Sequence, residues 1–200
     1  MNFMSVQNTY LSQVQGIQNN QNIHNTLSQD DNCKVEYVRK LNLNTFRPLR
    51  AGVIVYTIYK GKTYFILGID TASGNITDFG GGISFKRENA ITGGLREFSE
   101  ETLGIFGSID VDEIKNCVSV HNDKEVIIFV PFKINIESKY LEFMSRVKQV
   151  ENPEVMDLFI LNKKQFISLI DGRDINGITM YDKIRNLLSL GKNKNFIRYL

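Results

Sequence analysis

Residues 79–104 of this 200-residue chain read FGGGISFKRENAITGGLREFSEETLG. A short strand-like run at 77–79 enters the three glycines, which predict a turn. The apolar side chains that follow recur at helical spacing and fall on one stripe: Ile91, Leu95, Phe98 and Thr102. Gly104 is a typical helix stop, so the pattern predicts a helix over residues 89–103.

The segments on either side of this helix predict a sheet. Residues 51–59 and 63–70 are rich in β-branched and aromatic side chains, and the turn Lys60-Gly61-Lys62 between them predicts a hairpin. Further strands are expected at 116–120, 126–134 and 155–161, and further helices at 138–150, 163–170 and 180–190. Strands in hairpins with few intervening helices favour a mixed sheet with helices packed on it. The expected fold class is therefore α/β, in an α+β arrangement.

Length and composition indicate one folded domain with an appendage. Residues 1–34 are rich in Asn, Gln and Ser and predict a flexible extension, whereas residues 35–200 predict the domain. The formal net charge of +2 gives no strong cationic field of the kind that nucleic-acid binders show. Cys33 and Cys117 are too few for a disulfide framework, which favours a reducing compartment. Because neither a secretory signal nor a spanning apolar run is found, we expect a soluble, cytoplasmic protein with no membrane partner.

Three glutamates stand close together near the end of the expected helix. Glu97, Glu100 and Glu101 are spaced i, i+3 and i+4, so their carboxylates are expected on one face, opposite the apolar stripe. Each close pair of like charges destabilises a helix by about 0.2–0.5 kcal/mol unless a cation neutralises it. Carboxylate oxygens suit Mg²⁺ or Mn²⁺, which bind together with substrate phosphates. The cluster therefore predicts a divalent metal ion and a phosphorylated substrate.

Glycines and an arginine near the cluster support the same prediction. Gly93 costs the helix about 1 kcal/mol relative to Ala, so we infer that it leaves room for the preceding loop or for a ligand. The glycines at 80–82 allow positive φ and can direct backbone N–H groups at anionic oxygens, which makes Gly81 and Gly82 candidate substrate-binding residues. Arg96 can pair with a carboxylate and hold it in place for a metal ion.

This segment resembles the Nudix box, whose pattern is G-x5-E-x7-R-E-U-x-E-E-x-G-U, where U is an apolar residue. The matching residues are Gly82, Glu88, Arg96, Glu97, Phe98, Glu100 and Glu101. The chain departs from the pattern twice. Gly80 stands where Pro is common, so we expect a looser turn, and Gly104 comes one residue late, so we expect a longer helix exit. The resemblance covers about residues 50–190 and implies an α/β/α sandwich around a mixed β-sheet.

The resemblance also implies an activity and roles for the matching residues. Nudix hydrolases split the diphosphate of a nucleoside diphosphate linked to another group, using Mg²⁺ or Mn²⁺ and a water molecule that attacks phosphorus. By resemblance, Glu97, Glu100 and Glu101 are catalytic metal ligands. Arg96 and Glu88 belong to the same catalytic set, in which Glu88 orients the site or adds a ligand. The general base stays open among five carboxylates: Glu100, Glu101, Glu151, Glu154 and Asp157.

Several alternatives stay open. The expected substrate is a small nucleotide-type diphosphate, and no signature for NADH, coenzyme A or ADP-ribose hydrolysis identifies it. An mRNA 5′-cap hydrolase is the second interpretation, because basic residues at 39–50 and 183–198 would suit RNA. A noncatalytic nucleotide-binding sensor is the third, although it would not need the full glutamate set. The resemblance leaves a homodimer open, with 138–150 as its interface, and His121 is interpreted as a hairpin-loop residue rather than an acid or base.

Overall fold

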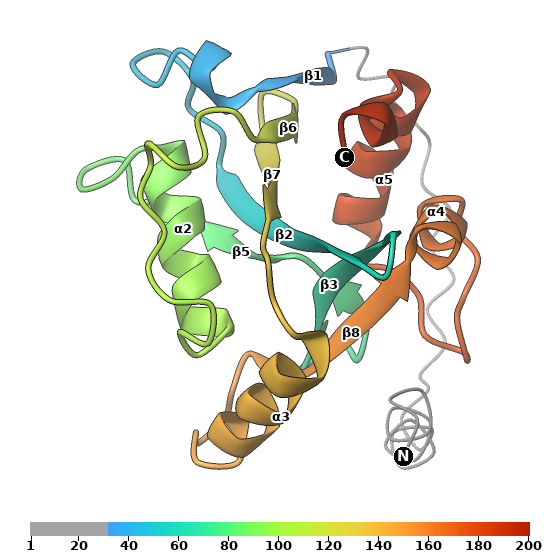
Figure 1. Ribbon diagram of the computed structural model, residues 1–200. Coiled ribbons are helices and arrows are strands. Elements are labelled where there is room, and N and C mark those ends of the chain that lie inside the picture. The colour runs from blue at the N-terminus through green and yellow to red at the C-terminus, as the bar shows by residue number, and fades with distance from the viewer. Residues whose placement is uncertain (1–31) are drawn as a thin grey trace.

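One mixed sheet forms the centre of the protein. A computed structural model describes residues 32–200 and is shown in Figure 1. Its strands are β1 (Lys34–Tyr37), β2 (Arg50–Tyr59), β3 (Lys62–Asp70), β4 (Ile76–Thr77), β5 (Phe79–Gly82), β6 (Val118–His121), β7 (Glu125–Pro131) and β8 (Val155–Asn162). The strand order is β1-β6-β7-β2-β3-β4, while β5 pairs with β2 and β8 pairs with β3. The predicted mixed sheet is therefore confirmed.

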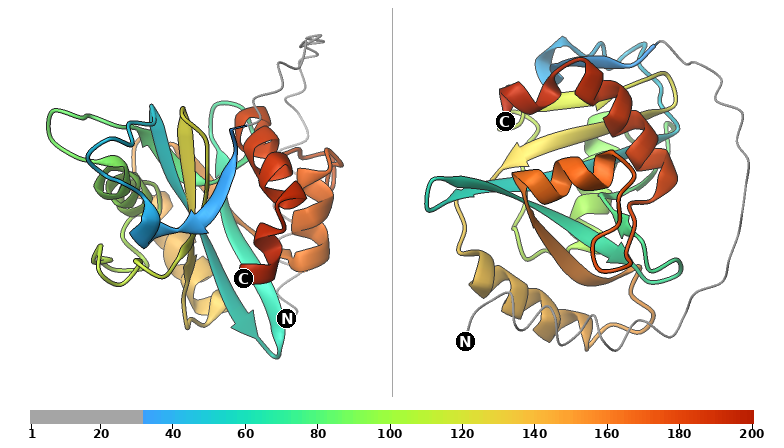
Figure 2. Two further views of the ribbon diagram at one scale, coloured as in Figure 1. Left: turned by 90° about the horizontal axis from the view of Figure 1, so that it is seen from above. Right: turned by 90° about the vertical axis from the view of Figure 1, so that its right-hand side faces the viewer.

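Helices cover both faces of this sheet (Figure 2). They are α2 (Ala90–Glu101), α3 (Ile136–Val147), α4 (Lys163–Ile170) and α5 (Asp182–Asn193), with short 3-10 helices at Val38–Lys40 and Phe196–Tyr199. One hydrophobic cluster joins α2 and α3 to the sheet, and a second joins α4 and α5 to the opposite face. The fold is the expected α+β sandwich with the sheet between two helical layers.

Strand β2 shows why the apolar runs in the sequence are nearly continuous. Val53 and Val55 point into the cluster of α2 and α3, whereas Ile54 points into the cluster of α4 and α5. The strand lies inside the sheet, parallel to β7 and antiparallel to β3, so both of its faces are buried. Lys60 and Gly61 join β2 to β3 with φ angles of 50° and 71°, as a tight hairpin turn of type I′ requires.

The three glycines before α2 form strand β5 instead of the predicted turn. Residues 79–82 pair with residues 50–53 of β2, and none of the three glycines has a positive φ. Close approach is what requires glycine here. A Cβ on Gly80 would lie 2.3 Å from the Cα of Gly52 and 2.5 Å from the carbonyl oxygen of Ala51. The predictions of positive φ and of a looser turn at Gly80 are therefore wrong, because the sheet continues through these residues.

The end of α2 also differs from the expectation. The helix ends at Glu101, and both Leu103 and Gly104 have positive φ, 54° and 66°. The N–H of Gly104 donates to the carbonyl of Ser99 (2.8 Å) and that of Leu103 to the carbonyl of Glu100 (3.1 Å), which is a Schellman end. The helix exit is thus not longer than in the box pattern. Leu103 adopts the left-handed conformation at the position where the pattern has Gly.

The other predicted elements are present, with ends shifted by a few residues. Helix α4 has its predicted bounds, whereas β7 ends at Pro131 and α3 begins at Ile136. Strand β1 was not predicted as a strand. The extension predicted for residues 1–34 lies mostly outside the described residues. In the part that is described, Cys33 is buried and Lys34 begins β1. Within residues 32–200, no helix is long and apolar enough to cross a membrane.

Two glycine substitutions test the close approach of β5 to β2. Gly80→Ala is expected to lower the free energy of unfolding by at least about 2 kcal/mol, because its methyl group would overlap backbone atoms. Gly82→Ala is the matched control, since a Cβ there would meet no other group within 4 Å, and its effect should stay within about 0.5 kcal/mol. Urea unfolding followed by circular dichroism measures both. Equal effects of the two substitutions would contradict the packing described.

Candidate active site

Helix α2 carries most of the predicted site residues, and its first turn is capped. The side chain of Asn89 accepts hydrogen bonds from the N–H groups of Ile91 (2.9 Å) and Thr92 (3.1 Å), and the Thr92 hydroxyl accepts one from the Asn89 N–H (3.0 Å). Farther along, an added Cβ on Gly94 would lie 3.1 Å from the Cβ of Ala51 in β2. The helix is therefore fixed at its start and lies close against the sheet.

Arg96 links carboxylates of the loop and of the helix. Its guanidinium donates to both oxygens of Glu88 (3.0 Å each) and is paired with Glu97 (2.8 Å). It also donates to Glu100 (2.9 Å). The hydrogen bond from Arg96, followed by one from the Ser84 N–H, lowers the pKa of Glu88. The expected pairing of Arg96 with a carboxylate is thus present, and Glu97 is among its partners.

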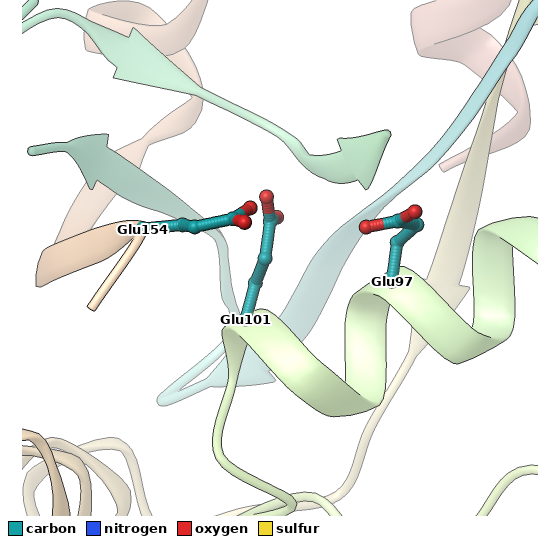
Figure 3. A group of neighbouring side chains, drawn as sticks. All are labelled: Glu97, Glu101 and Glu154. Carbon is teal, nitrogen blue, oxygen red and sulfur yellow. The ribbon is translucent and has the colours of Figure 1, made fainter. Parts of the chain in front are cut away.

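Three carboxylates converge beside the glycine strand, as Figure 3 shows. Glu97, Glu101 and Glu154 each offer one oxygen, and these oxygens lie within 4.8 Å of one another. Glu97 and Glu101 come from successive turns of α2, whereas Glu154 directly precedes β8. A Cβ on Gly81 would lie 2.5 Å from the carboxyl carbon of Glu97. The missing side chain at Gly81 is therefore what allows Glu97 to lie against β5.

The surroundings of Glu101 destabilise its negative charge. Its Oε2 accepts a hydrogen bond from the N–H of Gly80 (2.7 Å). Burial, and after it the nearby Asp78 carboxylate, raises the pKa of Glu101 to about 9, although the Gly80 N–H acts in the opposite direction. The side chain is therefore protonated at neutral pH when no cation is near. A bound cation would offset the loss of hydration that burial imposes on this carboxylate.

The chain segment around Glu154 is held by the loop between β3 and β4. The N–H of Thr71 donates to the carbonyl of Glu154 (2.8 Å), and its hydroxyl donates to the carbonyl of Pro153 (2.6 Å). An open pocket of about 190 Å³ lies beside the carboxylates and is lined by Glu100, Glu101, Leu103, Val150, Asn152, Pro153, Glu154 and Val155. The carboxylates therefore border space that a small ligand can enter.

The structure brings together some of the predicted site residues and separates others. Glu97 and Glu101 meet, but Glu100 is not in their group, because its side chain is 60% exposed and bound to Arg96. The sequence predicted that Glu97, Glu100 and Glu101 converge, but only Glu97 and Glu101 do. Gly93 has the role inferred for it, since a Cβ there would lie 3.2 Å from the carboxyl group of Glu88 in the preceding loop.

The candidates for the general base are also separated. Glu154 belongs to the carboxylate group, whereas Glu151 is exposed outside the residues that line the pocket. Asp157 is buried in β8, where it accepts a hydrogen bond from the N–H of Leu158 (2.7 Å). Burial raises the pKa of Asp157 to about 6. Asp157 therefore lies in the interior rather than at the pocket.

His121 is the last residue of β6 and is buried, so it does not lie in a hairpin loop. Its Nε2 is 2.8 Å from Oε1 of Glu36. Burial lowers the pKa of His121, against the opposing effect of Glu36. This histidine therefore pairs β1 with β6 and takes no part in the carboxylate group.

Two charged residues beside the site were not predicted to belong to it. Arg50 donates to both carboxylate oxygens of Asp78 (2.9 and 2.5 Å) and to the carbonyl of Gly80 (2.9 Å). The Asp78 side chain has no exposed surface. One feature of the sequence could have indicated this pair. Asp78 lies within the strand-like run 77–79, and a carboxylate that is buried in a strand requires a charged or hydrogen-bonding partner. Arg50 by itself is indistinguishable from the other basic residues at 39–50.

Comparisons with known proteins give structural matches alone. No protein-family model and no curated protein matches the sequence. A binary complex of a C. elegans Ap4A hydrolase is 15% identical with a TM-score of 0.44, over 76% of this chain and 99% of that chain. The NUDIX domain of Shewanella oneidensis NrtR, complexed with ADP ribose, is 13% identical with a TM-score of 0.42, over 79% and 96%. The second of these structures is a NUDIX domain, and the Nudix box is the motif that residues 82–104 of this chain resemble.

Replacing Glu101 by glutamine is expected to stabilise the metal-free protein at alkaline pH. In the folded protein Glu101 keeps its proton up to a pKa of about 9, whereas the unfolded chain loses it near 4.5. The free energy of unfolding therefore falls as the pH rises between these values, and Glu101→Gln removes this fall. We expect a gain of at least about 1 kcal/mol at pH 8 and a smaller one at pH 5.

Urea unfolding in EDTA at the two pH values measures this difference. Glu100→Gln serves as the control, because Glu100 is exposed and its surface ion pair with Arg96 contributes at most about 1 kcal/mol. If Glu101→Gln had the same effect at pH 5 and pH 8, the raised pKa of Glu101 would be refuted.

Proposed function

We propose that this protein is a Mg²⁺- or Mn²⁺-dependent Nudix hydrolase that cleaves the diphosphate of a small nucleotide derivative. The observation that supports this most is the convergence of Glu97, Glu101 and Glu154 against a strand of glycines, beside an open pocket. Two of these residues belong to the Nudix-box pattern, and the third comes from a distant loop. Meeting at one place is what a shared ligand would require of them.

The residues present fit a divalent cation. Three carboxylate oxygens within 4.8 Å of one another can share one ion, and Mg²⁺ and Mn²⁺ prefer such hard oxygen donors. The raised pKa of Glu101 supports the same conclusion, because burial foremost, and the nearby Asp78 carboxylate after it, destabilise a negative charge that a bound cation would stabilise. Glu97, Glu101 and Glu154 would hold this ion. Glu100 lines the same pocket and is proposed to contact a further ion.

In the proposed reaction the protein binds the diphosphate, orients the ligands and accepts a proton. When bound, the ion polarises the diphosphate oxygens and lowers the pKa of a water molecule. Arg96 keeps Glu97 in place against Gly81, and Gly82, where an added Cβ would meet nothing within 4 Å, leaves the end of β5 open to the diphosphate. Glu154 is exposed beside the pocket, so we propose it as the base that takes the proton of the attacking water.

The two other interpretations of the sequence differ from this proposal in measurable ways. A cap hydrolase holds a long RNA, whose binding weakens steeply with salt, whereas binding of a small nucleotide depends on salt much less. A nucleotide sensor binds without turnover.

From the sequence we also propose a cytoplasmic location and a homodimer whose interface includes α3.

Turnover by a matched pair of variants tests the proposed function. The wild-type protein, with Mg²⁺ or Mn²⁺, is expected to cleave one class in a panel of nucleoside triphosphates, nucleotide sugars, dinucleoside polyphosphates, ADP-ribose and capped RNA. Glu154→Gln should lose about 100-fold in kcat/KM, because an amide cannot accept the proton of the attacking water and brings no negative charge to the ion. Glu151→Gln, exposed three residues earlier, should stay within about three-fold of wild type.

Products are resolved by chromatography with mass detection, and the salt dependence of binding is measured for any RNA that is cleaved. Absence of turnover on the whole panel with both metals would refute the hydrolase and favour the sensor. Equal losses in Glu151→Gln and Glu154→Gln would refute the role of Glu154.

Metal binding itself has a proton signature. Binding of Mn²⁺ at pH 7 is expected to release about one proton, because Glu101 is protonated in the metal-free protein and must ionise to act as a ligand. Titration calorimetry in buffers of different ionisation enthalpy counts the protons. Glu101→Gln should bind Mn²⁺ more weakly and release none. Tight binding by wild type without proton release would show that Glu101 is not a ligand.

A further inference from the structure

An ion pair between buried Asp78 and half-buried Arg50 lies next to the carboxylate group but outside the proposed chemistry. Asp78 stands between β4 and β5, and Arg50 begins β2. Both oxygens of Asp78 accept hydrogen bonds from Arg50, so this carboxylate is already occupied. A buried ion pair adds little net stability, because desolvation offsets most of the attraction. We therefore ask which backbone group the pair holds in place.

The pair reaches the candidate metal site through Gly80. Nη2 of Arg50 donates to the carbonyl of Gly80 (2.9 Å), and the N–H of Gly80 donates to Oε2 of Glu101 (2.7 Å). Gly80 is thus held on one side by the ion pair and on the other by the glutamate. A displacement of Arg50 would move the N–H group that fixes Glu101.

Glycines allow the backbone to close around the ion pair. A Cβ on Gly52 would lie 2.0 Å from a carboxylate oxygen of Asp78. Gly52 is the register partner of Gly80 in the pairing of β2 with β5. Glycine at position 52 therefore leaves the space that the Asp78 carboxylate fills beside β2. There Asp78 accepts two hydrogen bonds from Arg50, which donates a further one to the carbonyl of Gly80.

The charges around Arg50 agree with this arrangement. Burial alone would lower the pKa of Arg50, but the carboxylates around it, Asp78 foremost, raise it, so the guanidinium stays charged. Glu101 and Glu125 are the other two carboxylates that act on it. The half-buried Arg50 is thus the cation on the sheet side of Glu101, as Arg96 is the cation next to Glu97.

We infer that Arg50 and Asp78 are positioning residues, which hold Gly80 so that its N–H directs the carboxylate of Glu101 toward Glu97 and Glu154. That this positioning matters for catalysis rests on the proposed function. The positioning itself is a property of the metal-free protein. Arg50 and Asp78 act through Glu101 rather than on the reacting atoms.

Two variants and a matched control test this inference. Asp78→Asn removes the charge at nearly constant shape, and Arg50→Lys keeps the charge but loses the planar group that bonds Asp78 and Gly80 together. Glu36→Gln is the control, because it breaks a pair with buried His121 in the pairing of β1 with β6. The readouts are Mn²⁺ affinity without substrate, the ¹H–¹⁵N resonance of the Gly80 amide, and the free energy of unfolding.

We expect Asp78→Asn and Arg50→Lys to weaken Mn²⁺ binding at least about ten-fold and to shift the Gly80 amide in the same direction as Glu101→Ala does. Glu36→Gln should leave both readouts unchanged. An unshifted Gly80 amide together with wild-type Mn²⁺ affinity in a folded variant would overturn the inference, even if stability were lost. Arg50→Lys carries the test where Asp78→Asn does not fold.

The same experiment separates this inference from the proposed function. If wild-type protein binds no Mn²⁺, the proposed function fails. The Gly80 amide then still decides whether Arg50 and Asp78 position Glu101, because that hydrogen bond is present without metal.

Discussion

Helix α2 lies closer to strands β2 and β5 than side chains would permit, and the candidate site depends on this contact. Glycines stand where an added Cβ would meet another group at 3.2 Å or less. Gly81 and Gly94 lie between α2 and the two strands, Gly52 and Gly80 lie where β2 meets Asp78 and β5, and Gly93 lies between α2 and the loop that carries Glu88. Because no side chain intervenes, the carboxylate of Glu97 rests on Gly81, and that of Glu101 reaches the backbone N–H of Gly80. The glycines are used here for space and not for unusual backbone angles.

This close contact also determines the electrostatics of the site. Glu101 is held where water is scarce, and burial raises its pKa, whereas Glu88 is bound to Arg96 and has a lowered pKa. Two glutamates of one motif thus have opposite shifts. Arg96 supplies positive charge on one side of the carboxylate group, and the half-buried Arg50 supplies it on the other. Burial nevertheless outweighs the effect of Arg50 and keeps the pKa of Glu101 raised in the metal-free protein.

The elements predicted well from the sequence are those whose information is local. The hairpin of β2 and β3 follows from two apolar runs around Lys60 and Gly61, and α2 follows from a stripe of apolar residues at helical spacing. Strand β1 has only four residues and exists through its pairing with β6, which lies some 80 residues away in the chain. Likewise, residues 80–82 predict a turn from their composition, but pairing with β2 makes them a strand.

Within the site, the sequence alone established the residue types and their spacing, because a helix of about 3.6 residues per turn fixes which positions share a side. It could not establish which carboxylates meet. Arg96 binds Glu100 at the surface, while the β3–β4 loop holds the backbone that carries Glu154 to the group. The pairing of Asp78 with Arg50, 28 residues earlier, is of the same kind. Such contacts depend on how the strands and α2 pack against one another, and no spacing along the chain encodes that packing.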